Sequence, residues 1–148
     1  MYHEPYRSQG PLDSLPAMAR AALFAWVGIV VLQIVNVLTV GVSLVIFYPL
    51  QALLYIASGA LAAHFAYEDV YQRDIPGSDI VREGAGSGLI LSVLSWITYA
   101  VLIFALGLFT LGAGWLGYIS FLVCVPGDLA VGALLGALGA WLFHRFWA

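Results

Sequence analysis

The sequence predicts an all-α membrane protein in which four transmembrane helices form a bundle. Of its 148 residues, 63% are hydrophobic and 9% are charged, whereas a soluble domain is about 45–50% apolar and about 25% charged. Two long apolar stretches separate the charged segments: Ala21 to Ala66, and Gly84 to Phe143, which is interrupted only by Asp128. This pattern excludes an ordinary water-soluble globular domain.

The arginines decide how many times the chain crosses the bilayer. A spanning helix needs about 20 apolar residues to cross a hydrocarbon core about 30 Å thick, so the first stretch holds two crossings and the second holds two or three. With four crossings every basic residue lies on one face, which the positive-inside rule makes cytoplasmic. These residues are Arg7, Arg20, Arg73, Arg82 and Arg145. We therefore expect a multi-pass protein of the plasma (cell) membrane with cytoplasmic N- and C-termini.

The helices are bounded by turn residues and prolines. Residues 1–17 are acidic and proline-containing, unlike a secretory signal, and we expect an irregular cytoplasmic segment there, followed by a transmembrane domain over 18–148. Proline is favoured at the first helical position, where its missing N–H would have no partner, so Pro49 and Pro126 mark helix starts. The expected helices are 18–40, 49–72, 79–109 and 126–146.

The outer connectors, 41–48 and 110–125, are apolar and carry no charge. Unpaired backbone is not stable in lipid. These segments therefore either extend the helices or lie in the membrane interface, and the sequence leaves both alternatives open.

The two apolar stretches resemble each other. Pro49 and Gly59 in the first correspond to Pro126 and Gly136 in the second, with the same interval of ten residues. Trp26, Thr39 and Gly41 also match Trp96, Thr110 and Gly112 in order along the chain. One interpretation is two tandem helical hairpins, a parallel repeat about an axis along the membrane normal; the other is chance matching in a chain rich in glycine and alanine.

A strip of small residues runs along the last helix. Glycines four apart let another helix approach closely, so that van der Waals contact holds the pair together. The partner helix belongs either to the same chain or to another copy. The predicted helix-packing residues, called the glycine strip below, are Gly132, Gly136, Gly139, Ala133, Ala137 and Ala140.

Polar side chains on the first two helices form a second candidate site. Residues three or four apart share one helix face, and this intramembrane polar cluster comprises Gln33, Asn36, Gln51, Tyr55 and Ser58. Such groups form interhelical hydrogen bonds worth about 0.6 kcal/mol each, or they line a polar pathway or ligand site. Because no charge accompanies them, we favour hydrogen bonding.

Two histidines, His64 and His144, lie near the cytoplasmic helix ends. Histidines on facing helices could bind a b-type haem through both axial positions. The favoured alternative is that each imidazole meets the negative end of its helix dipole. We expect no other cofactor and no metal site, because the acidic loop 67–85 does not match a calcium loop and Cys124 is the only cysteine.

The motifs also limit the function. The chain has no nucleophile elbow, metalloprotease helix or phosphate-binding loop, and a net charge of −3 offers no basic face for nucleic acid. We expect a non-enzymatic membrane protein in the lipid bilayer that packs as an accessory subunit in a larger membrane complex or as a homo-oligomer. The alternatives are an oligomeric channel or transporter for a small solute or ion, and a haem-carrying electron-transfer subunit.

Overall fold

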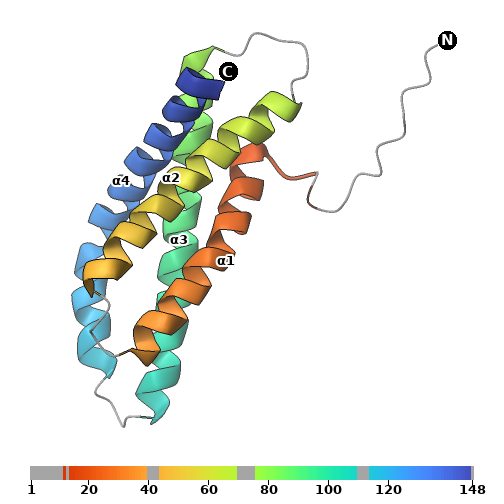
Figure 1. Ribbon diagram of the computed structural model, residues 1–148. Helices are drawn as coiled ribbons and strands as arrows, with labels where there is room; N and C mark the ends of the chain where they lie inside the picture. The colour runs from red at the N-terminus through yellow and green to blue at the C-terminus, as the bar shows by residue number, and fades with distance from the viewer. Residues whose placement is uncertain (1–11, 13, 40–43, 70–75, 110–113, 148) are drawn as a thin grey trace, which may run out of the picture.

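The computed structural model describes residues 12, 14–39, 44–69, 76–109 and 114–147. They form four helices: α1 (Ala17–Leu38), α2 (Leu44–Asp69), α3 (Gly77–Phe109) and α4 (Gly114–Trp147), shown in Figure 1. Each helix contains a segment long and apolar enough to cross a membrane. The predicted bundle of four transmembrane helices is confirmed. The predicted irregular segment 1–17 lies mostly outside the described residues.

Successive helices run in opposite directions. In Figure 1 the starts of α1 and α3 and the ends of α2 and α4 lie together at the top of the bundle. Arg20, Arg82 and Arg145 belong to these four helix ends. We call this side of the bundle the arginine end.

The outside of the bundle is apolar. Large hydrophobic side chains are exposed on every helix, including Val27 (62% exposed), Leu53 (59%), Val101 (62%) and Leu134 (70%). Apolar surface of this extent is covered in a functional protein rather than left in water, and helices of this length are covered by lipid. The chain is therefore a multi-pass integral membrane protein in contact with the bilayer.

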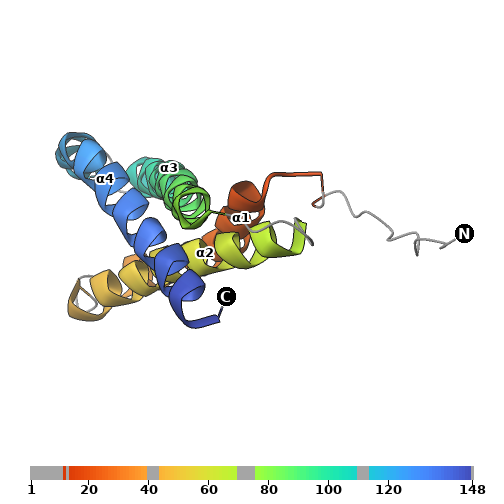
Figure 2. The same ribbon diagram turned by 90° about the horizontal axis from the view of Figure 1, so that it is seen from above.

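The helices differ in length and in their neighbours. α3 packs most extensively on α4, and α2 lies across both, as Figure 2 shows. α1 packs on α2 and α3, but within the described residues it does not pack on α4. With 22 residues against 33, α1 is about 33 Å long and α3 about 50 Å, so α3 and α4 continue beyond α1 at the far end (Figure 1).

The prediction that Pro49 and Pro126 begin helices is wrong. α2 begins at Leu44 and α4 at Gly114, so both prolines lie inside helices. A helix that ends in an apolar environment leaves several backbone groups without partners, whereas an internal proline removes one hydrogen bond and bends the helix. Of the two alternatives for the outer connectors, helix extension therefore applies to 44–48 and 114–125; residues 40–43 and 110–113 lie outside the described part.

The interior is built from small side chains. One buried cluster contains Ala22, Ala25, Ile29, Tyr55 and Leu91. A second, nearer the arginine end, contains Ala63, Ile80 and Ala140. Because alanine adds little volume, the helices pack at short distance.

Candidate functional site

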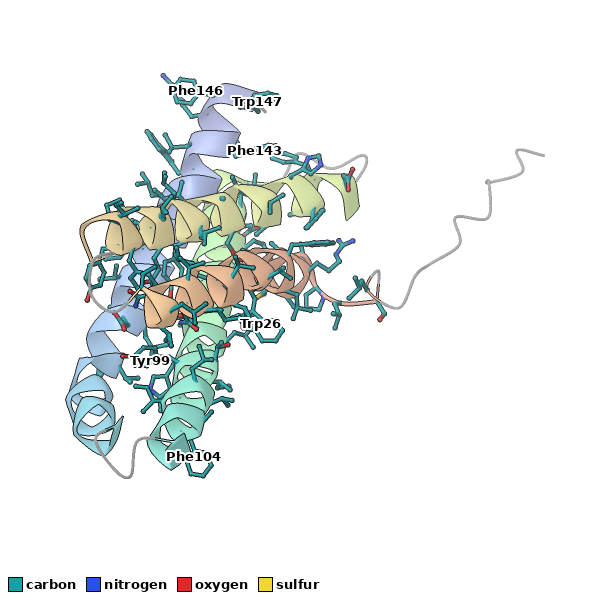
Figure 3. The ribbon with its side chains drawn as sticks, turned by 60° about the horizontal axis from the view of Figure 1, so that its bottom comes forward. Trp26, Tyr99, Phe104, Phe143, Phe146 and Trp147 are labelled. Carbon is teal, nitrogen blue, oxygen red and sulfur yellow. The ribbon has the colours of Figure 1, made fainter. Side chains whose placement is uncertain are left out.

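Two side chains of α1 bond to α3. The buried Gln33 donates from Nε2 to Ser95 O at 3.1 Å and to Ser95 Oγ at 2.9 Å. Trp26, labelled in Figure 3, donates from Nε1 to Thr98 Oγ1 at 2.8 Å. These bonds join α1 to α3 within the apolar bundle.

α3 also bonds to the other two helices. The hydroxyls of Ser58 in α2 and Ser87 in α3 are fully buried and hydrogen-bond to each other. Ser92 Oγ donates to Asp128 O of α4 at 3.3 Å and to Gly88 O of its own helix at 3.0 Å. α3 therefore contributes a hydrogen-bonding side chain to its contact with each of the other helices.

The members of the predicted polar cluster lie in different contacts between helices. Gln33 and Ser58 each bond to α3, whereas Tyr55 lies in the buried apolar cluster. Asn36 and Gln51 are half-buried. Ser87 and Thr98, the partners of Ser58 and Trp26, were not predicted from the sequence. Their spacing could have indicated them. Thr98 lies three residues after Ser95 and Ser87 eight residues before it, so both lie on the side of α3 that carries Ser95.

The glycine strip faces α2 and α3 of the same chain. A Cβ built on Gly59 of α2 would lie 2.8 Å from Gly136 Cα, and one built on Gly136 would lie 3.0 Å from Gly88 Cα. Gly139 faces the α2 backbone, where a Cβ would lie 3.1 Å from Ala60 N. Backbones this close leave no room for a side chain.

The remaining strip residues differ in burial. A Cβ built on Gly132 would lie 3.2 Å from Ser92 Cβ of α3. Ala140 is fully buried, and Ala133 and Ala137 are half-buried. Gly132, Gly136 and Ala140, which follow one another at intervals of four residues, are all buried and form the most enclosed line of the strip.

His144 lies where three helices meet. Its Nδ1 shares a hydrogen bond with Tyr67 OH of α2, and the two rings are nearly parallel at 11°. A Cβ built on Gly77, the first residue of α3, would lie 3.1 Å from His144 Nε2. His64 lies 3.6 Å from Glu68 within α2, Nε2 to Oε1.

These histidines do not fit a haem. Axial ligation needs two imidazole nitrogens that face an apolar slot. The nitrogen of His144 that its bond to Tyr67 leaves available is Nε2, and Nε2 faces Gly77 instead of a slot. Phe143, labelled in Figure 3, contacts His64 and Tyr67 with ring centroids 5.9 and 6.1 Å apart. A row of rings therefore connects the two imidazoles.

In the described part of the chain, no three His, Cys, Asp or Glu side chains gather as a metal site would require.

Comparison with known proteins gives no relative: no protein-family model, curated protein or solved structure matches the chain.

Proposed function

We propose that this chain is a non-catalytic membrane protein that acts by packing, as an accessory subunit of a larger membrane complex or as a homo-oligomer. The observation that carries the proposal is that the interior groups of the bundle contact one another. Glycines of the strip meet the backbones of α2 and α3, and buried hydroxyls pair across helices. The interior groups thus hold the bundle together, and the apolar outer faces remain for lipid and neighbouring helices.

We also propose that the protein resides in the plasma membrane with its arginine end and both termini in the cytoplasm. Arg20, Arg82 and Arg145 support this orientation through the positive-inside rule. Aromatic side chains are enriched at membrane interfaces. Phe146 (73% exposed) and Trp147 (83%), which follow Arg145 in the sequence, point away from the bundle in Figure 3.

Purification in a mild detergent tests the packing role. Light scattering coupled to size-exclusion chromatography gives the protein mass without the detergent. We expect a mass of several copies, or a second protein in stoichiometric amount that stays bound. A single copy without a partner, at concentrations as high as those in the membrane, would contradict the proposal.

One observation favours the channel or transporter as a second candidate. Gln33 is 3% exposed, and its Oε1 accepts no hydrogen bond among the described residues. An acceptor at this depth is a feature of polar pathways. Ion and small-solute efflux from liposomes separates the candidates. The packing proposal predicts that liposomes with the protein lose ions and solutes no faster than protein-free liposomes do. A faster efflux that Gln33→Leu abolishes would establish the channel.

A further inference from the structure

Asp128 is an acidic residue in the middle of the membrane-spanning part of α4. It is the only Asp, Glu, Lys or Arg between Gly84 and Phe143, and it lies 17 residues before Arg145, about 25 Å along the helix. Ser92 of α3 donates from Oγ to its backbone O at 3.3 Å. The residue before Ser92 is Leu91, which packs on the middle of α1 in the first buried cluster. Asp128 is therefore level with the middle of α1 and far from both membrane surfaces.

The carboxylate of Asp128 has no partner among the described residues. The side chain is exposed and forms neither an ion pair nor a hydrogen bond with them. The described arginines belong to the arginine end, and Arg7 and Arg73 precede α1 and α3 in the sequence. Acids at this depth are costly in lipid, and they usually pair with another group or face a polar interior. The described part of the chain supplies neither.

Asp128 belongs to an exposed, otherwise apolar face of α4. Val131, Leu134 and Leu138 are 51%, 70% and 42% exposed. They follow Asp128 at intervals of three or four residues, so the four side chains occupy one side of the helix. The glycine strip, on a different side of α4, packs on α2 and α3, and within the described residues α1 does not pack on α4. We call these four residues the Asp128 face.

We infer that the Asp128 face binds a transmembrane helix of a different protein, and that this helix carries a basic side chain near its middle. Opposite charges attract far more strongly in apolar surroundings than in water. A basic residue in the middle of a helix needs a counter-charge as much as Asp128 does, so the two helices stabilise each other.

A second copy of the chain does not supply this partner. The positive-inside rule orients all copies alike, so a second copy has its arginines at the same end and brings only another Asp128 to this depth. The inference rests on the proposed function, because it specifies the partner of the accessory subunit and the face that binds it.

Association with designed peptides in liposomes tests the inference. The full chain carries a donor dye at Thr39→Cys in a Cys124→Ser background. The probe is a poly-leucine transmembrane peptide with terminal lysines, one central arginine and an acceptor dye. We expect more energy transfer to this peptide than to the same peptide with leucine in place of the arginine. The central position makes the contact independent of the direction in which the peptide crosses the bilayer.

Two matched variants assign the effect to Asp128. Asp128→Asn keeps the size of the side chain without its charge, and it is expected to abolish the difference between the two peptides. Asp79→Asn is the same change in the first turn of α3, and it is expected to leave the difference intact. Equal transfer to both peptides before substitution, or an undiminished difference in Asp128→Asn, would overturn the inference.

Cysteine cross-linking tests whether a second copy occupies the same face. Val131→Cys in the Cys124→Ser background presents a thiol on the Asp128 face. Leu53→Cys, on the exposed side of α2 (59% exposed), measures cross-linking by random collision. We expect no more oxidised dimer from Val131→Cys than from Leu53→Cys. A clear excess would show that copies pair through this face and would overturn the inference.

The mass measurement in detergent separates a failure of this inference from a failure of the proposed function. A different protein that stays bound after Asp128→Asn would overturn the inference and leave the packing role intact. A single copy without a partner, before any substitution, would contradict the packing role and the inference that rests on it.

Discussion

Gly136 is a residue at which three helices meet. Its backbone contacts Gly59 of α2 on one side and Gly88 of α3 on the other. In lipid, helix association depends on van der Waals contact and hydrogen bonds rather than on water exclusion. A side chain at this point would separate the helices and reduce that contact along their length.

We predict that Gly136→Ala lowers the free energy of unfolding, because overpacking of a close contact typically costs about 1–3 kcal/mol. Gly127→Ala is the matched control in the same helix, since a Cβ there meets nothing within 4 Å. The control should be neutral or should gain up to about 1 kcal/mol of helix propensity. Chemical or thermal unfolding in detergent measures both. A control as unstable as Gly136→Ala would show that the contacts of Gly136 are not the cause.

For the buried amide of Gln33 we predict a smaller loss of unfolding free energy. Gln33→Met keeps the side-chain volume but removes the bonds to Ser95, and interhelical hydrogen bonds in membranes average about 0.6 kcal/mol with a maximum of about 1.7 kcal/mol. We expect a loss of unfolding free energy in this range. Thr39→Val is the control, because the Thr39 hydroxyl bonds to Val35 O of its own helix at 2.8 Å. A loss well above this range would assign Gln33 a larger role than one interhelical contact.

At the scale of the elements, the sequence predicts which segments are helical better than where helices begin. The apolar stretches give four helices, and α1 and α3 begin within two residues of the positions expected from sequence. α2 and α4 begin earlier than expected, at Leu44 and Gly114. Proline is favoured as the first residue of any helix, and it is also tolerated inside membrane helices. The local sequence does not distinguish these two positions.

The candidate site is less predictable, because it depends on which helices become neighbours. The spacing of Gly132, Gly136 and Ala140 predicts a close contact but not the identity of the partner helix. His144 is predicted near a helix end, but its partner Tyr67 lies 77 positions away. Contacts of this range are set by the packing of the whole bundle.

The early start of α4 has a measurable consequence. If the helix begins at Gly114, the backbone amides of residues 118–125 bond to carbonyls four residues earlier. We predict slow hydrogen exchange for these amides in detergent. A helix that begins at Pro126 would instead leave 118–125 exchanging as fast as a loop, and mass spectrometry of peptides from this region distinguishes the two.

At the scale of the whole molecule, the central claim is that the chain crosses the membrane four times with its arginine end in the cytoplasm. The positions that test it are exposed at opposite ends of helices. Ser78 lies in the first turn of α3 at the arginine end, and Thr39 follows α1 at the other end. One crossing, α2, separates Thr39 from Ser78, so the four-crossing account places these two positions on opposite sides of the membrane.

The most direct measurement is labelling of single cysteines with a membrane-impermeant thiol reagent in intact cells. In a Cys124→Ser background, Thr39→Cys is expected to react in intact cells, and Ser78→Cys only after the membrane is permeabilised. Reaction of Ser78→Cys from outside with protection of Thr39→Cys would reverse the orientation. Equal reaction of both positions in intact cells would place them on one side of the membrane and contradict the four-crossing account.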